Sequence, residues 1–170
     1  MFNMKLVVDA CSIILLAKAT VLEEVAKWRQ VMISTGVYKE VMEGKGKQGI
    51  DALILEKLGE EKKITIKNNI KKELVEKLMT DLGLGDGEAE SIALALETKE
   101  KMIVTDNKQG RKAAKVQGLR LSGSIEIIMA LYKTKRISKE KIQSALRTLK
   151  EKGWFQDYLI EEALREVQNE

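Results

Sequence analysis

Short apolar runs alternate with longer segments of helical spacing along this chain of 170 residues, and this alternation constrains the fold more than any other feature. The apolar runs predict strands over residues 5–8, 31–34, 64–66, 102–105 and 119–121. Strands that alternate with helices build β-α-β units, in which a parallel sheet is covered on both faces. The expected fold class is therefore α/β, a three-layer α/β/α sandwich with a central parallel sheet of about five strands.

The segments between these runs carry apolar residues at helical spacing. They predict helices over residues 12–27, 35–43, 49–60, 69–80, 87–99, 108–117, 123–134, 139–152 and 156–168. Gly44 and Gly46 predict a loop. The length and the 44% of apolar residues suit one core, so we expect a single domain over residues 1–170. The helices from about residue 137 onward are expected to form packing layers or partner surfaces.

The composition narrows the chemistry. The chain has no histidine and a single cysteine, Cys11, which excludes an internal disulfide, zinc sites built from Cys and His, and imidazole bases. Any chemistry must rest on carboxylates, hydroxyls, lysines or a hard metal ion. Lys and Arg (30) exceed Asp and Glu (26) by four, which is compatible with a nucleic-acid partner without requiring one. Without a membrane span or a signal-peptide layout, we expect a cytoplasmic protein with no membrane partner.

Two aspartates follow predicted strands directly. Asp9 comes after the first strand, and Asp106 comes after the strand at residues 102–105, with Asn107 beside it. In open parallel sheets, ligands bind outside the carboxyl ends of the strands. Each aspartate taken alone is equally well explained as a cap of the following helix, because Asp is a preferred cap.

Helical geometry selects two glutamates. At about 100° per residue, Glu40 lies at the border of a buried helix face, whereas Glu43 is nearly opposite that face and should be solvated. Glu88 lies in a first helical turn near the core border, and Glu90 lies on the other border. Alone, Glu40 is typical of a surface residue, and Glu88 of a first-turn acid that favours the helix dipole, with Asp86 as the expected cap.

The convergence of these acids changes their interpretation. Carboxylates gathered in one cleft raise each other's pKa values unless a cation neutralises them. Oxygen-only ligands favour Mg²⁺ or Mn²⁺ over zinc or copper. Such a metal activates water and stabilises charge on a phosphoryl oxygen, which suits phosphodiester cleavage without histidine. The candidate catalytic and metal-binding residues are Asp9, Glu40, Glu88 and Asp106.

Five stretches also carry a family likeness, in order along nearly the whole chain: VVDACSIILLAKA, VMISTGVYKEVMEG, LGLGDGEAESIALALE, IVTDNKQGRKAAKVQGL and SGSIEIIMALYKTKRI. With them the chain resembles the PIN domain family of metal-dependent ribonucleases, in particular the stand-alone prokaryotic branch that includes VapC-type toxins. The resemblance implies an acidic pocket for Mg²⁺ or Mn²⁺, formed by the same four acids. It also implies that Ser12 steadies the site by hydrogen bonding and that Asn107 assists a metal-bound water.

The sequence departs from the family at two places. The third acid is often Asp in the toxins but is Glu88 here, with Glu90 close by, so which glutamate faces the metal stays open. The position after Asp106 is often a second Asp and is Asn107 here, which lowers the negative charge and weakens the case for a second metal.

Basic and aromatic residues bear on the substrate. Lys108 and Arg111 lie near the acidic end of their helix and are predicted to bind RNA phosphates, whereas Lys112 and Lys115 fit a solvated face. Apolar surroundings predict core or interface positions for the aromatic residues, so the sequence does not support base stacking. These residues are Trp28, Trp154 and Phe155. Cys11 is interpreted as a packing residue.

The first hypothesis is a metal-dependent endoribonuclease that acts on single-stranded RNA. The resemblance further implies a toxin with an antitoxin protein as partner, and a homodimer. The alternative is a catalytically weak PIN-like RNA-binding or assembly module. A phosphoaspartate enzyme of the haloacid dehalogenase kind is disfavoured, because Cys11 stands where a second Asp is needed. A receiver lacks its paired acids, and GLGDGE is no P-loop because no Gly-Lys-Ser/Thr follows.

Overall fold

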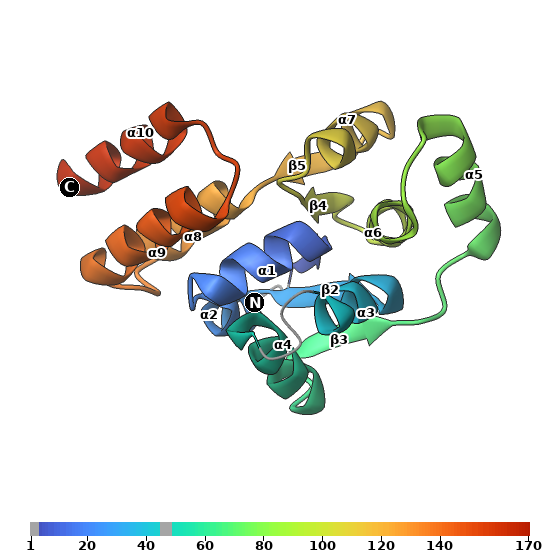
Figure 1. Cartoon of the computed structure of the whole chain (residues 1–170), viewed down its shortest axis with the longest axis horizontal. Helices are drawn as coiled ribbons and strands as arrows, with labels where there is room; N and C mark the ends of the chain where they lie inside the picture. Colours follow the sequence, from blue (N-terminus) through green and yellow to red (C-terminus); the bar gives the residue numbers. More distant parts are fainter. Residues whose placement is uncertain (1–3, 45–48) are drawn as a thin grey trace.

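The computed structural model describes residues 4–44 and 49–170. At its centre is a five-stranded, all-parallel sheet with the strand order β3-β2-β1-β4-β5 (Figure 1). The strands are β1 (Lys5–Val8), β2 (Gln30–Ser34), β3 (Ile64–Lys67), β4 (Met102–Val104) and β5 (Arg120–Ser122). Each strand ends within about one residue of its predicted bounds, and the predicted α/β fold class is confirmed.

Helices connect all the strands. They are α1 (Ala10–Lys18), α2 (Leu22–Trp28), α3 (Thr35–Glu43), α4 (Ile50–Glu60), α5 (Lys72–Leu82), α6 (Asp86–Glu97), α7 (Lys108–Val116), α8 (Ser124–Lys133), α9 (Lys139–Lys152) and α10 (Asp157–Gln168). None of the helices within the described ranges has the length and apolar character needed to cross a membrane. Gly44 follows α3 as predicted, whereas Gly46 of the same predicted loop lies outside the described residues.

The prediction of one helix over residues 12–27 is wrong. Two helices occupy this segment, because the chain turns between them at Thr20, whose φ is +57°. The Thr20 N–H bonds to the Ala17 carbonyl (2.9 Å), which ends the first helix in a tight turn. Val21 and Leu22, just after the turn, are fully buried, so the turn keeps the apolar pattern facing the core while the axis changes direction.

Successive strand residues face opposite sides of the sheet and build two cores. On one face, Leu6, Val8 and Ile33 pack with apolar residues of α1–α4 and α8. On the other, Val7, Met32 and Ile103 pack with α5, α6 and α7. Helix α9 packs against α8, and α10 packs against α9, at the opposite end of the molecule from α5 (Figure 1). The sheet is therefore covered on both faces, which completes the three layers.

The strand order creates a switch point between β1 and β4. From β1 the chain proceeds to β2 and β3 on one side, and it then returns to the other side of β1 to form β4 and β5. Asp9 N donates to Val104 O (3.1 Å), so this pairing continues to the very end of both strands. Crevices at such points, outside the carboxyl ends of the strands, are where open α/β sheets bind ligands.

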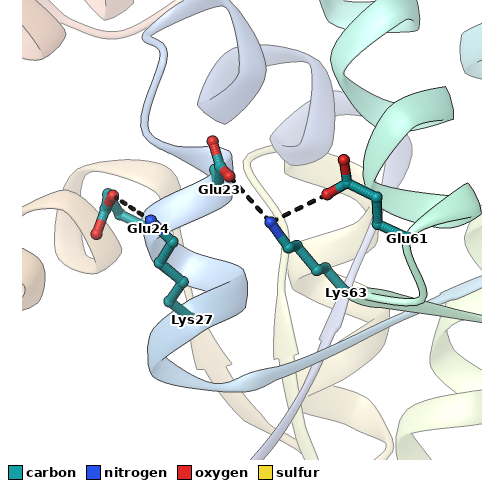
Figure 2. Close-up of polar contacts among 5 residues, drawn as sticks. All are labelled: Glu23, Glu24, Lys27, Glu61 and Lys63. Atoms are coloured by element: carbon teal, nitrogen blue, oxygen red, sulfur yellow. Dashed lines mark hydrogen bonds and ion pairs between the residues drawn. The ribbon is translucent and has the colours of Figure 1, made fainter.

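Surface ion pairs lie beside the start of the edge strand β3 (Figure 2). Lys63, just before β3, lies 3.2 Å from Glu23 of α2 and 3.0 Å from Glu61 at the end of α4. Lys27 and Glu24 form a further pair within α2, at 3.4 Å. These side chains are largely exposed, so water and salt screen the pairs, which fasten α2 to the neighbouring turn only weakly.

Candidate active site

Asp9, directly after β1, is held from two sides. Its side chain is buried, with 5% of its surface exposed. Oδ1 accepts a hydrogen bond from Ser12 N (2.9 Å), so Asp9 does cap α1, as the capping interpretation proposed. Oδ2 accepts a hydrogen bond from the Thr105 hydroxyl. Capping engages one oxygen, and the second oxygen ties Asp9 to the end of β4.

Asp106 lies two residues beyond β4 and is also engaged on both oxygens. Oδ2 accepts from Ser12 Oγ (2.8 Å) and from the Ser124 hydroxyl, and Oδ1 accepts from Ser124 N (3.0 Å). The capping alternative for Asp106 is wrong, because Asn107 caps α7 by accepting from Gly110 N (2.9 Å). Ser12 therefore joins the two aspartates, through its backbone N–H to Asp9 and through its hydroxyl to Asp106.

Two hydroxyl residues of this network were not predicted from the sequence. Thr105 immediately precedes Asp106, and Ser124 is the first residue of α8 after β5. Gly123 lets α8 begin this close, because a Cβ there would lie 2.8 Å from Asp106 Oδ1. The available signal was the same one that selected the aspartates, namely a polar residue at the carboxyl end of a parallel strand.

Glu40 of α3 and Glu88 of α6 lie close enough for their charges to interact. A Cβ on Gly87 would lie 3.6 Å from Glu40 Oε2, which places that carboxylate beside the start of α6. Burial and the charge of Glu40 both raise the pKa of Glu88, against a hydrogen bond from the Gly85 backbone. Among the described residues, Glu88 Oε2 is a buried oxygen without a hydrogen-bond partner. A buried, unpartnered carboxylate oxygen is costly unless something else binds it.

Glu90 is engaged elsewhere. Its Oε2 accepts a hydrogen bond from Gly36 N (3.0 Å) at the start of α3. The contact needs glycine, because a Cβ at position 36 would lie 2.2 Å from that oxygen. The expected cap of α6 is also wrong, since Gly85 occupies the N-cap position and Asp86 begins the helix. Glu43 is exposed, as predicted.

All four candidate acids line one cavity of about 450 Å³, together with residues from the turn between α9 and α10. Glu90 is not among its lining residues, so the structure turns Glu88 and not Glu90 toward this cavity. Cys11 is exposed and lines the cavity, so its interpretation as a packing residue is wrong. Cys11 lies on the outward side of α1, whereas Ile13 and Leu16 on the opposite side of this helix are buried in the core.

The cavity is strongly electronegative. Burial raises the pKa of Asp9 to about 6, and the charge of Asp106 adds to this, while hydrogen bonds from Thr105 and Ser12 act in the other direction. The walls of the cavity shield the Cys11 thiol from part of the solvent, and this desolvation together with the charges of Asp9, Asp106 and Glu40 raises the pKa of Cys11 to about 12. The thiol therefore stays protonated at neutral pH and is no nucleophile. A field of this sign favours a bound cation.

The residues fit a hard divalent cation by chemistry. The donors are carboxylate oxygens, which Mg²⁺ and Mn²⁺ prefer, and Glu88 supplies an oxygen with no partner within the described part of the chain. The acids stand as two pairs, Asp9 with Asp106 and Glu40 with Glu88. Within residues 4–44 and 49–170, no three acidic or thiol side chains converge on a common point.

The basic residues near the cavity take different positions. Arg111 donates from Nη1 to Thr105 O (2.8 Å) and lies 3.5 Å from Ser122 O, so it holds together the ends of β4 and β5. Lys108 is exposed beside it, and Lys112 and Lys115 are exposed farther along α7, as predicted for a solvated face. Arg111 therefore supports the backbone next to Asp106. The RNA contact predicted for Arg111 stays a prediction.

An α/β fold with an acidic cavity at its switch point offers a ligand site whose carboxylate oxygens suit a divalent cation. A sequence model of the PIN domain matches residues 5–169, nearly the whole chain. The chain belongs to the PIN domain family, whose members are generally nucleases that use divalent metal ions. A search among curated proteins found no match.

Proposed function

We propose that this chain is a metal-dependent endoribonuclease that hydrolyses phosphodiester bonds of single-stranded RNA. The observation that carries the proposal is the cavity at the switch point, which acids from four separate places in the sequence line together. The unpartnered Glu88 oxygen and the raised pKa of Asp9 add to it, because both groups would gain from a bound cation. Membership of a family of nucleases supports the same reading.

The roles of the residues follow from their contacts. Asp9, Glu40, Glu88 and Asp106 would hold Mg²⁺ or Mn²⁺, which when bound activates water and stabilises charge on the phosphoryl oxygens. Ser12, Thr105 and Ser124 orient the two aspartates by donating hydrogen bonds to them. Lys108, exposed at the start of α7, would contact a phosphate of the substrate. Asn107 uses its side-chain oxygen to cap α7, so any contact with water would come from its amide nitrogen.

Cleavage of a labelled single-stranded RNA, with and without Mn²⁺ or Mg²⁺, tests this proposal. We expect cleavage that requires the metal and that falls by at least about 100-fold in Asp106→Asn and in Asp9→Asn. Glu40→Gln should also lose activity, whereas Glu43→Gln, exposed on the same helix, should keep it. Unchanged cleavage in Asp9→Asn or Asp106→Asn overturns the assignment.

Two observations favour a second candidate, a PIN-like RNA-binding or assembly module without turnover. No three acids of the described residues converge on one point, and Asn107 stands where a further acid is common. Calorimetric titration with Mn²⁺ separates the candidates. A nuclease binds the ion at the four acids and loses the heat signal in Asp106→Asn, whereas a module without turnover gives no specific signal in either protein.

The finer proposal is a VapC-like toxin that acts in the cytoplasm as a homodimer and is neutralised by an antitoxin protein. It rests on the family and on the motifs of the sequence. Induced expression in a bacterial host should then arrest growth, and Asp106→Asn should relieve the arrest. Normal growth during expression of an active nuclease overturns the toxin role and leaves the ribonuclease proposal standing.

A further inference from the structure

A second cavity, of about 720 Å³, adjoins the acidic cavity. It lies between α8 and α10 and has a largely apolar wall that includes Ile125 and Met129. Asp106, Trp154 and Phe155 line both cavities. A chain that places a phosphate among the four acids can therefore continue past these three side chains into the space between the helices.

Trp154 stands on the border between the cavities with its side chain fully exposed (102%). Its neighbours are fixed. Phe155 turns inward against the core and packs over Gly153, where a Cβ would lie 2.4 Å from the ring. Gly153 N closes α9 by donating to Leu149 O (2.8 Å). The indole is thus held outward by the packing of the residues around it, so of the predicted core or interface position for Trp154 the core alternative is wrong.

A fully exposed indole contributes no buried surface to the fold, and both its faces are free to contact a ligand. Tyr158, in the first turn of α10, is also largely exposed (58%) and lines the second cavity. Lys108 lines that cavity, and Lys152 lines the acidic cavity, so a cation lies on each side of the aromatic border. Aromatic faces flanked by cations match the bases and phosphates of a single strand of nucleic acid.

The far part of the second cavity has a different character. There Lys133 of α8 is paired with Glu166 of α10 at 2.7 Å, and Glu162 adds a further negative charge. These groups disfavour phosphates. The aromatic side chains and Lys108 lie toward the end that adjoins the acidic cavity, where Glu126 also lines the wall beside Asp106.

We infer that Trp154 stacks on a base of the RNA segment adjacent to the scissile phosphate, with Tyr158 as a second stacking surface. Lys108 and Lys152 contact the phosphates on either side of that base. The inference rests on the proposed function, since it takes the strand in the acidic cavity to be RNA. Base stacking is a role that the sequence alone did not support, because apolar surroundings predicted a core or interface position for Trp154.

Anisotropy of fluorescently labelled single-stranded RNA tests the inference, with every variant made in an Asp9→Asn background that suppresses cleavage. Trp154→Ala should raise Kd by roughly 5- to 100-fold, and Trp154→Phe should retain most of the affinity. Leu53→Ala, which removes an exposed apolar side chain on α4, should leave Kd unchanged. A second series of RNAs carries an abasic site at each position in turn. At the position that meets Trp154, Trp154→Ala should add no further loss.

Cleavage of the same RNA by the protein with Asp9 intact is measured in parallel, so that the two proposals fail separately. If Mn²⁺-dependent cleavage occurs but Trp154→Ala leaves both Kd and KM unchanged, stacking is overturned and the nuclease stands. If Trp154 governs binding but no cleavage occurs, stacking is supported and the nuclease is overturned. A Trp154→Ala protein that binds RNA normally but loses self-association in sedimentation would assign this surface to a second copy, against the inference.

Discussion

Two aspartates and three hydroxyl groups form the centre of the candidate site. Asp9 and Asp106 come from the ends of neighbouring strands, and the hydroxyls of Ser12, Thr105 and Ser124 each donate to one of them. Hydrogen bonds of this kind offset part of the cost of burying a carboxylate. They do not remove it for Asp9, whose pKa remains raised to about 6. The fold therefore holds an unfavourable charge in place, as sites that bind cations do.

This charge predicts a dependence of stability on pH. Asp9 binds its proton more tightly in the folded state, so the stability it contributes is present below about pH 4 and is lost as the pH rises through 6. Without divalent ions at pH 7, Asp9→Asn should be more stable than the wild type by up to about 3 kcal/mol, and the difference should vanish near pH 4. Urea denaturation at both pH values measures this. A difference that is the same at pH 4 and pH 7 would refute the account of Asp9.

The hydroxyl of Ser124 is predicted to position Asp106. Ser124→Ala leaves the backbone N–H bond to Asp106 and removes the hydroxyl bond, so the Mn²⁺ affinity should fall about 10-fold or more while the protein still folds. Ser144→Ala, an exposed serine on α9, is the matched control. Calorimetric titration gives the affinity, and circular dichroism verifies folding. Equal Mn²⁺ affinities in the two variants would leave Ser124 without this role.

Helices α3 and α6 carry the two glutamates, and one hydrogen bond joins these elements. Glu90 of α6 accepts from Gly36 N at the start of α3, where only glycine leaves room for the carboxylate. The same two helices bring Glu40 and Glu88 to the cavity. The spacing between the glutamates therefore depends on a contact made by residues that do not line the cavity.

Substitutions at this contact should weaken Mn²⁺ binding, although Gly36 and Glu90 do not line the cavity. Gly36→Ala forces Glu90 away, so we expect a loss of about 1–3 kcal/mol in unfolding free energy and weaker Mn²⁺ binding. Glu90→Gln keeps an acceptor oxygen and should stay close to the wild type in both, whereas Glu90→Ala should not. Glu97→Ala, exposed on the same helix, serves as control. Wild-type stability and Mn²⁺ affinity in Gly36→Ala would show that the contact does not set the spacing.

At the scale of the whole molecule, the sequence predicts what depends on periodicity and topology. Buried parallel strands read as apolar runs, so their ends located Asp9 and Asp106, and helical geometry placed Glu40 and Glu88 on the same cavity. Features of the structure that depend on a local turn were not predicted from the sequence. The chain bends at Thr20 through a positive φ, and Trp154 faces outward because Phe155 takes the inward place beside Gly153. Neither outcome leaves a periodic signal in the residues.

The hydrogen bonds from hydroxyl groups to the two aspartates were also not predictable from the sequence pattern. Ser12 was expected to support the site, yet its bond to Asp106 spans 94 positions of the chain and depends on the β1–β4 pairing. Ser124 joins the network because Gly123 allows α8 to begin beside Asp106, and Thr105 reaches Asp9 because β1 and β4 are paired. Such contacts require the assembled sheet, so residue type and spacing do not predict them one by one.

The central claim is that the four carboxylates bind a divalent metal ion. Anomalous diffraction from a crystal soaked in Mn²⁺ tests it most directly, with an Asp106→Asn crystal soaked in the same way as control. We expect an anomalous peak coordinated by oxygens of Asp9, Glu40, Glu88 and Asp106 in the wild type, weakened or absent in the variant. A cavity without a peak at saturating Mn²⁺, with the four side chains still apart as two pairs, would contradict it.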